Sequence, residues 1–410
     1  ARHGGRVVFV RHALPGERVR ARVTEGGASA RFWRCDAVAV LEASEDRVQP
    51  PCPVARPGLC GGCDFQHVAL EAQRRLKAEV VAEQLRRLAG LEREVVVEAV
   101  PGDVDGLRWR TRTAFAVDAA GRAGLRKHRS HEVVALADCP ISTEAVVGTG
   151  VLGERWAHVE VLEVAAPSDG GDPLLVVTPA PGGPARLRLP RPAGTSVAVR
   201  TAGGGLERVS GRTWLAERVE AAGVEHRFRV SGAGFWQVHP GAGTALVEAV
   251  LAGLRPRPGE RALDLYSGAG LFTAALAEAV GVTGTVVAVE QDARAVKDAR
   301  RALHEHGQVR LVAARVDAAL AAPGAPDAVP GEVDVVVLDP PRSGAGREVV
   351  ERLVGLRPRA VAYVACDPAA LARDVATFAG LGYRLEDLRA FDLFPMTHHV
   401  ECVGVLVPVG

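Results

Sequence analysis

Residues 261–280 have the sequence RALDLYSGAGLFTAALAEAV, and this stretch decides the fold. It contains the pattern of a short apolar strand, a Gly-x-Gly turn at Gly268 and Gly270, and an apolar helix. Glycines at the end of a strand let the backbone turn sharply and lie close to a ligand. The stretch therefore predicts a strand–turn–helix unit with a ligand site at the carboxyl end of the strand.

The same alternation continues on both sides of this stretch. Strand patterns such as TVVAVE, VDVVVL and AVAYVA alternate with helical patterns such as ARAVKDARRALHEHG and PAALARDVATFAGLG. Apolar strands that alternate with amphipathic helices are typical of a parallel sheet covered by helices on both faces. The predicted fold class is therefore α/β, with a doubly wound Rossmann-like sheet in a domain that covers residues 231–410.

Different patterns precede this domain. Residues 1–47 alternate in strand fashion between turns, which predicts a small OB-like β-barrel. Residues 48–230 begin with irregular chain rich in Pro, Gly and Cys, followed by a helical pattern over 69–90 and then by strand patterns. This segment predicts a central α+β domain, so we expect three domains in all.

Length and composition exclude several classes of protein. The 410 residues exceed one ordinary domain, and 48% hydrophobic with 24% charged residues exclude a disordered chain. No apolar run approaches the roughly 18 residues of a membrane-spanning helix. No signal peptide is visible, so we expect a cytoplasmic protein. Seven cysteines, an odd number, argue against a disulfide framework.

Two acidic motifs follow other predicted strands of the sheet. Glu290 ends the strand TVVAVE, where a carboxylate suits the two hydroxyls of a ribose. Asp339, Pro340 and Pro341 follow the strand VDVVVL, and prolines stiffen a loop above the sheet where ligands bind. With the Gly-x-Gly turn, these motifs resemble class I S-adenosylmethionine-dependent methyltransferases. A dehydrogenase, or an α/β domain that binds no nucleotide, is the alternative.

Two further side chains have both a structural and a catalytic interpretation. Cys366 follows the strand VAYV and is either a small core residue or a nucleophile. Glu401 lies in an apolar strand and is either exposed at an edge or a base with a raised pKa. His398 and His399 are expected to point to opposite sides of that strand, so neither is expected to bind a metal.

Together these motifs resemble the RNA uracil-C5 methyltransferases, which make 5-methyluridine in transfer and ribosomal RNA. The matching segments are SGAGFWQVH (231–239), LDLYSGAG (263–270), VVLDPPRSG (336–344), VAYVACDPAALARD (361–374) and FPMTHHVECV (394–403). RVVFVRHALPGERVRARV (6–23) is similar to the RNA-binding TRAM domain of that family. The resemblance implies S-adenosylmethionine as methyl donor and rRNA or tRNA as partner, with no membrane and no obligate protein partner.

The resemblance also assigns roles to residues. Cys366 would add to C6 of the uracil, and Glu401 would remove the proton from C5. The cofactor-binding positions would be Gln237, Tyr266, Glu290, Asp317 and Asp339. Two positions depart from the family pattern, because Leu271 and Asp367 stand where asparagine is common.

Four cysteines resemble the ligands of the [4Fe–4S] cluster that many family members carry. Three lie close together, and the fourth is distant in sequence: Cys52, Cys60, Cys63 and Cys139. A Pro- and Gly-rich loop can wrap a cluster without competing secondary structure. Zinc in the same four-cysteine site is the main rival. A radical S-adenosylmethionine enzyme would need a barrel of strands around its cysteines, and the predicted strands lie elsewhere.

Local charge suggests where RNA would bind. Only three of the 50 basic residues are lysines, which leaves 47 arginines, but the net charge is +1, so arginine abundance alone indicates nothing. Basic residues are in excess within 1–35 and 105–131, and Trp109 and Phe115 are candidates for stacking on bases. The alternative is a solvated basic face.

Two other functions remain open from the sequence. An adenine amino-group methyltransferase also uses an Asp-Pro-Pro type of loop, but it would have no use for Cys366 or Glu401. An RNA-binding protein that has lost catalysis would be consistent with the departures at Leu271 and Asp367.

Overall fold

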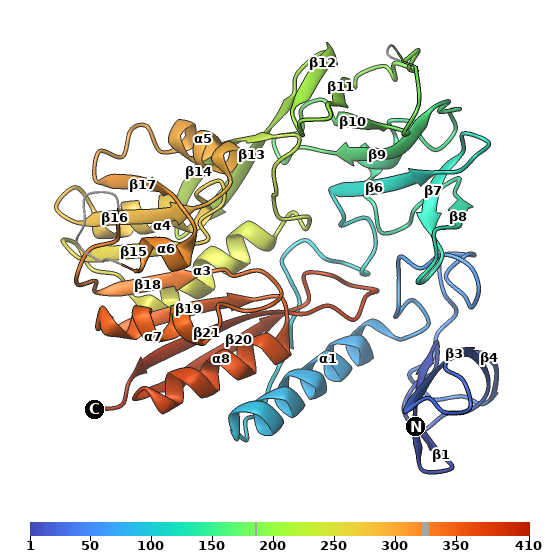
Figure 1. The fold of residues 1–410 in the computed structure, drawn as a ribbon, viewed down its shortest axis with the longest axis horizontal. Coiled ribbons are helices and arrows are strands. Elements are labelled where there is room, and N and C mark those ends of the chain that lie inside the picture. Colours follow the sequence, from blue (N-terminus) through green and yellow to red (C-terminus); the bar gives the residue numbers. More distant parts are fainter. Residues whose placement is uncertain (185–186, 322–327) are drawn as a thin grey trace.

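The computed structural model describes residues 1–184, 187–321 and 328–410 (Figure 1). The chain begins with a four-stranded sheet in the order β1-β2-β4-β3. Its strands are β1 (Arg2–His3), β2 (Arg6–Arg11), β3 (Arg18–Glu25) and β4 (Phe32–Glu42). The β-rich character predicted for the first 47 residues is thus present, and short turns connect the strands.

A long helix follows the cysteine-rich loop. Helix α1 (Leu70–Gln84) continues as the helical turn η1 (Leu85–Ala89), which confirms the helix predicted over 69–90. It ends at Gly90, whose φ of 66° is the left-handed conformation that favours glycine at a helix C-terminus.

The central sheet has seven strands in the order β12-β11-β10-β9-β6-β7-β8. Its strands are β6 (Arg112–Val117), β7 (Ala123–Arg126), β8 (Val133–Ala135), β9 (Val159–Ala165), β10 (Leu174–Pro179), β11 (Ser196–Arg200) and β12 (Leu206–Ser210). Helix α2 (Glu144–Val147) lies in the connection between β8 and β9. A separate hairpin, β13 (Trp214–Ala221) and β14 (Val224–Ser231), leads into the C-terminal part of the chain.

The C-terminal sheet has eight strands in the order β17-β16-β15-β18-β19-β21-β20-β5. Its strands are β5 (Val97–Glu98), β15 (Arg261–Leu265), β16 (Thr285–Glu290), β17 (Val309–Ala313), β18 (Val335–Leu338), β19 (Ala360–Ala365), β20 (Tyr383–Phe391) and β21 (Glu401–Pro408). Its helices are α3 (Ala242–Leu254), α4 (Leu271–Val280), α5 (Ala293–Ala302), α6 (Val316–Ala319), α7 (Arg347–Gly355) and α8 (Pro368–Gly380). The five strands from β17 to β19 are parallel, which confirms the predicted Rossmann-like sheet.

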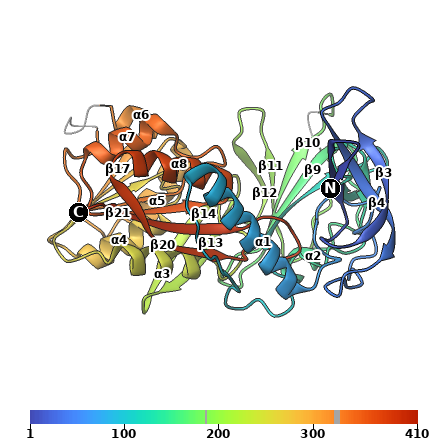
Figure 2. The same cartoon turned by 90° about the horizontal axis from the view of Figure 1, so that it is seen from below.

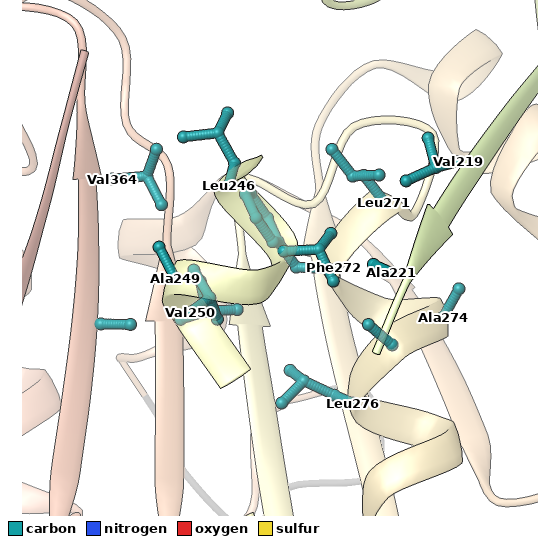
Figure 3. Packing of buried hydrophobic residues seen from close by; sticks show 14 of the residues in the cluster. Val219, Ala221, Leu246, Ala249, Val250, Leu271, Phe272, Ala274, Leu276 and Val364 are labelled. Carbon is teal, nitrogen blue, oxygen red and sulfur yellow. The ribbon is translucent and has the colours of Figure 1, made fainter. Parts of the chain in front are cut away.

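Alternate residues of each parallel strand belong to two separate cores. Val335 and Val337 of β18 pack with α3 and α4, whereas Val336 and Leu338 pack with α7 and α8. Figure 3 shows the first of these layers, in which side chains of α3 and α4 meet. Because both faces of the strands are covered, the strand sequences are mostly apolar rather than alternating, as in VVVL of β18 and AVAYVA of β19.

Part of the central segment belongs spatially to the C-terminal sheet. Helix α1 packs against α8 (Figure 2). Strand β5 pairs with β20 at the edge of the sheet. Residues 70–98, which the sequence placed with the central domain, therefore lie against the C-terminal unit. Within the described ranges, no helix combines the length and apolarity needed to span a bilayer.

Candidate active site

The order of the parallel strands places a crevice between β15 and β18. The chain leaves β15 toward β16 on one side and reaches β18 on the other side, which is the topological switch point where such sheets bind ligands. Tyr266 directly follows β15 and has a φ of 62°, which is uncommon for a residue with a side chain. Gly268 and Gly270 continue the turn with φ values of 54° and 92°. The predicted turn is thus present at the crevice.

Glu290 is held against this glycine turn. One carboxylate oxygen accepts a hydrogen bond from the backbone N–H of Gly268 at 3.0 Å, and the other accepts from the N–H of Asp292 at 2.6 Å. These bonds fix a carboxylate at the carboxyl end of β16, beside the turn. The arrangement matches the position expected for a carboxylate that binds a ribose.

The pairing of β19 with β21 brings Cys366 and Glu401 together. The two strands are antiparallel, and Ala365 is opposite Cys402 in the register. Cys366 follows Ala365 and Glu401 precedes Cys402, so the two side chains are neighbours at the end of the sheet. Cys366 is partly exposed, whereas the other six cysteines are buried. Cys366 is thus the accessible thiol of the chain.

Leu271 and Asp367, the two residues that depart from the family pattern, both have structural roles. The Asp367 carboxylate accepts a hydrogen bond from the N–H of Ala370 at 2.8 Å and caps helix α8. An asparagine side chain can make the same bond, so the cap beside Cys366 is kept. Leu271 packs in the core between α4 and the hairpin, as Figure 3 shows, and its side chain has no polar atom that could contact a ligand.

Six of the seven residues predicted for catalysis and cofactor binding line one cavity of about 530 Å³. They are Gln237, Tyr266, Glu290, Asp339, Cys366 and Glu401. The seventh, Asp317, lines an adjoining cavity of about 490 Å³, which also contains Tyr266 and Glu290. Asp317 pairs there with Arg315 at 2.8 Å. The two cavities therefore adjoin at Tyr266 and Glu290.

Buried carboxylates dominate the electrostatics of the cavity. Burial raises the pKa of Asp339 to about 7. Glu401 is buried rather than exposed at an edge, and burial together with the charge of Asp339 raises its pKa well above its ordinary value. Burial and the charges of Glu401 and Asp339 raise the pKa of the Cys366 thiol to about 11, while Arg342 lowers it.

Arg342 and Phe394 are among the cavity residues that were given no role from the sequence. Arg342 lines the cavity, and its guanidinium lies 3.4 Å from Nε2 of His399. In the sequence Arg342 directly follows Pro340 and Pro341. A basic residue so close to the Asp339 carboxylate could have indicated a role in the site. Phe394 also lines the cavity. No local pattern distinguishes it from a core aromatic residue.

The prediction that His398 and His399 lie on a strand and point oppositely is wrong. β21 begins only at Glu401, and the two imidazole rings lie 4.2 Å apart in the preceding loop. His398 contacts the carboxylate of Asp64 at 2.6 Å. His398 therefore connects the loop between β20 and β21 with the cysteine-rich segment that contains Asp64.

The four cysteines proposed as cluster ligands are all buried. Burial is the main reason why the pKa of Cys63 is raised to about 12, and negative charge on the other three thiols would raise it further. The thiols are therefore electrostatic neighbours, although Cys139 is distant in sequence. In the part of the chain that the structure describes, no three or more His, Cys, Asp or Glu side chains are arranged as a metal-binding group.

Backbone and side-chain donors approach two of these sulfur atoms. The N–H of Gly62 lies 3.4 Å from Sγ of Cys60, and Nε2 of Gln66 lies 3.2 Å from Sγ of Cys63. Gly61 is needed where the loop meets the β7–β8 hairpin, because a Cβ there would lie 2.5 Å from the backbone nitrogen of His128. The loop is therefore closely fitted to its surroundings.

The expectation that Trp109 and Phe115 stack on bases is wrong. Their exposed fractions are 3% and 0%, because both belong to the core of the central sheet. The basic segment 105–131 is also largely neutralised. Six of its seven Arg and Lys side chains form ion pairs, and the seventh, Arg110, is partly buried.

The chain resembles known proteins over its full length. The family model "tRNA (Uracil-5-)-methyltransferase" matches residues 202–408. An uncharacterized RNA methyltransferase of Streptomyces avermitilis is 50% identical over 418 residues, which cover 99% of this chain and 94% of that protein. The 23S rRNA (uracil(1939)-C(5))-methyltransferase RlmD of Pseudomonas putida is 33% identical over 98% of this chain and 89% of its own length.

A solved structure shows the same fold. The tRNA (uracil-54, C5)-methyltransferase of Pyrococcus abyssi, in complex with S-adenosyl-L-homocysteine, aligns with a TM-score of 0.72 at 23% identity. The alignment covers 98% of this chain and 95% of that one. The arrangement of the N-terminal, central and C-terminal sheets is therefore shared.

The electrostatics of the cavity make a prediction about the Cys366 thiol. Its pKa of about 11 means that alkylation by iodoacetamide should be slow near neutral pH and accelerate as the pH approaches that value. Glu401→Gln removes a negative charge that raises this pKa, so its pH profile should shift to lower pH. Arg342→Gln removes a positive charge that lowers the pKa, so its profile should shift to higher pH. Mass spectrometry of the Cys366 peptide measures the alkylation rate of each variant as a function of pH. Shifts of both profiles in the same direction would contradict the opposite effects of Glu401 and Arg342 on the thiol pKa.

Proposed function

Because the chain belongs to the RNA uracil-C5 methyltransferase family, we propose that it methylates C5 of a uridine in rRNA or tRNA through a covalent adduct with Cys366. Its membership makes it an S-adenosylmethionine-dependent RNA methyltransferase. The observation that carries the proposal is the accessible thiol of Cys366 beside the buried carboxylate of Glu401 in one cavity.

The chemistry of uracil requires a nucleophile. C5 of uracil is a poor nucleophile, and its hydrogen is not acidic, so direct transfer of a methyl group is slow. The Cys366 thiolate forms a bond to C6, and the electrons of the C5–C6 double bond move toward O4. C5 then attacks the methyl group on the sulfonium, whose bond to sulfur breaks to leave S-adenosylhomocysteine.

Glu401 completes the reaction as a base. Methyl transfer leaves C5 with both a methyl group and a proton, and Glu401 takes the proton. The electron pair of the C5–H bond restores the double bond, and the bond between C6 and Cys366 breaks. A carboxylate whose pKa is raised by burial and by Asp339 accepts a proton more readily than an exposed one.

The remaining cavity residues divide between the methyl donor and the base. Tyr266 and Glu290, which line both cavities, and Asp317, in the adjoining one, would hold the adenosine part of the donor. Gln237 and Asp339 lie in the cavity with Cys366, where they would orient the donated methyl group and the edge of the uracil. The target nucleotide must leave its stack to enter this cavity.

The N-terminal sheet has features of an RNA-binding surface, in keeping with its resemblance to a TRAM domain. Its aromatic side chains Phe9 and Phe32 are 55% and 38% exposed, and their ring centroids lie 5.7 Å apart. The guanidinium of Arg34 lies over the Phe32 ring. Exposed rings next to arginines can stack on unpaired bases while the arginines contact phosphates.

A [4Fe–4S] cluster on the four buried cysteines is part of the proposal. The N–H groups directed at the sulfur atoms of Cys60 and Cys63 suit thiolate ligands. Arg110 is partly buried and interacts electrostatically with Cys139 and Cys63, and its positive charge would offset the negative charge of a ligated cluster. A bound cluster would connect the cysteine-rich loop to Cys139 in the central domain.

Covalent adducts distinguish the proposed function from its alternatives. RNA that contains 5-fluorouridine has no removable proton at C5, so elimination should stall after methyl transfer. The wild-type protein should form an adduct with this RNA that survives denaturing electrophoresis, and Cys366→Ala should form none. An adenine amino-group methyltransferase would stay active as Cys366→Ala. A protein that has lost catalysis would not bind S-adenosylmethionine in calorimetry.

Glu401→Gln provides the complementary result. This variant keeps the nucleophile but cannot take the C5 proton, so an adduct should accumulate even on RNA with ordinary uridine. Turnover should fall by roughly 10²–10⁴-fold, which is the usual contribution of a positioned base. Normal turnover by Glu401→Gln would assign the base to another group, with His399 as the next candidate.

Metal analysis tests the cluster. Protein purified without oxygen should be brown and contain about four iron atoms per chain. Cys52→Ala or Cys139→Ala should lose the colour, whereas Cys35→Ala and Cys402→Ala should keep it. A colourless protein with one zinc per chain would contradict the iron assignment.

A further inference from the structure

A second pocket lies outside the active site, between the hairpin and helix α5. It has a volume of about 200 Å³, and its charged and aromatic lining residues are Trp214, Arg229, Arg294, Lys297, Asp298 and Arg301. We call it the Trp214 pocket. Asp298 also lines the active-site cavity, so the pocket and the cavity share a wall.

Positive charge in the Trp214 pocket is only partly compensated. Its single carboxylate, Asp298, is buried and already accepts hydrogen bonds from the N–H of Ser231 at 2.7 Å and from Arg301 at 3.1 Å. Among the described residues, no carboxylate lies within ion-pair distance of Arg229 or Lys297. The pocket thus differs from segment 105–131, where ion pairs neutralise most of the cations.

Aromatic stacking holds part of this charge in place. The guanidinium of Arg229 lies 4.1 Å from the centre of the Trp214 ring, and that of Arg212 lies 4.9 Å from it. A guanidinium that stacks on an aromatic ring keeps its N–H groups available in the plane. These donors match the spacing of phosphate oxygens. The pocket therefore offers fixed donors together with the mobile ammonium group of Lys297.

We propose that the Trp214 pocket binds backbone phosphates of the RNA strand next to the target nucleotide. This inference rests on the proposed function in that the substrate is RNA. A nucleotide inserted into the active-site cavity leaves its flanking phosphates at the cavity mouth, and the pocket adjoins that cavity through Asp298. The contacts are to phosphates, so they strengthen binding of any strand sequence.

The test compares two double variants that remove equal charge. Arg229→Ala/Lys297→Ala removes the two cations of the pocket that have no carboxylate within ion-pair distance among the described residues. The control is Arg227→Ala/Arg300→Ala on the same two elements, where Arg227 pairs with Glu225 and neither residue lines the pocket. Binding of a fluorescein-labelled oligouridylate, about 20 nucleotides long, is measured by anisotropy at several salt concentrations without methyl donor.

The pocket variant should show a weaker dependence of affinity on salt. For single strands the slope of log K against log salt changes by about 0.7 per phosphate contact, so the loss of two contacts should reduce it by about 1.4. The control should keep the wild-type slope. In methylation assays the pocket variant should show a raised KM for RNA with kcat unchanged.

The inference would be overturned if the slope of log K against log salt were equal for the pocket variant and the wild type. It would also be overturned if both double variants lost the same amount of affinity for the oligouridylate. An acidic protein partner for this surface would give the first of these results. The same experiment separates this inference from the proposed function. If no uridine were methylated but the salt slope of the pocket variant still differed from that of the wild type, the phosphate-binding inference would be supported and the proposed function would be contradicted.

Discussion

The buried ion pair between Lys77 and Asp392 holds together the parts of the chain on which the active site depends. Nζ of Lys77 lies 2.5 Å from the carboxylate of Asp392 and donates a hydrogen bond to the carbonyl of Phe394 at 3.1 Å. Both charged side chains are almost completely buried. A buried charge without its partner is costly, so the pair fixes α1 against the loop that precedes Glu401. Lys77 is one of only three lysines in an arginine-rich chain.

The same loop is held from a second side by the cysteine-rich segment. Backbone N–H groups of Asp64 and Phe65 both donate to the carbonyl of Met396 at 3.0 Å. Gln73 accepts a hydrogen bond from the N–H of Met396 at 2.8 Å. Asp64 directly follows Cys63, so the segment proposed to hold the cluster also positions the chain that leads to Glu401. The cysteine-rich segment and Glu401, the proposed base, therefore depend on one loop.

Local patterns in the sequence predicted the parallel strands and the glycine turn, because each of these features is formed by contiguous residues. Cys366 and Glu401 were assigned to one site only through the family resemblance, because the strand pairing that brings them together is not visible in either segment alone. Burial was harder to predict. Trp109 and Phe115 looked available for RNA, but packing of the central sheet covers them. The contact of Lys77 with the loop joins residues more than 300 positions apart, and no local pattern reports such a contact.

Release of the C5 hydrogen tests the central claim most directly. RNA labelled with tritium at C5 of uridine is incubated with the protein and S-adenosylmethionine, and tritium released to water is compared with methyl groups transferred. One tritium should be released for each methyl group transferred, because in the proposed mechanism Glu401 removes the C5 hydrogen before Cys366 leaves. Methyl transfer without release of tritium would place the methyl group on another atom and contradict the account.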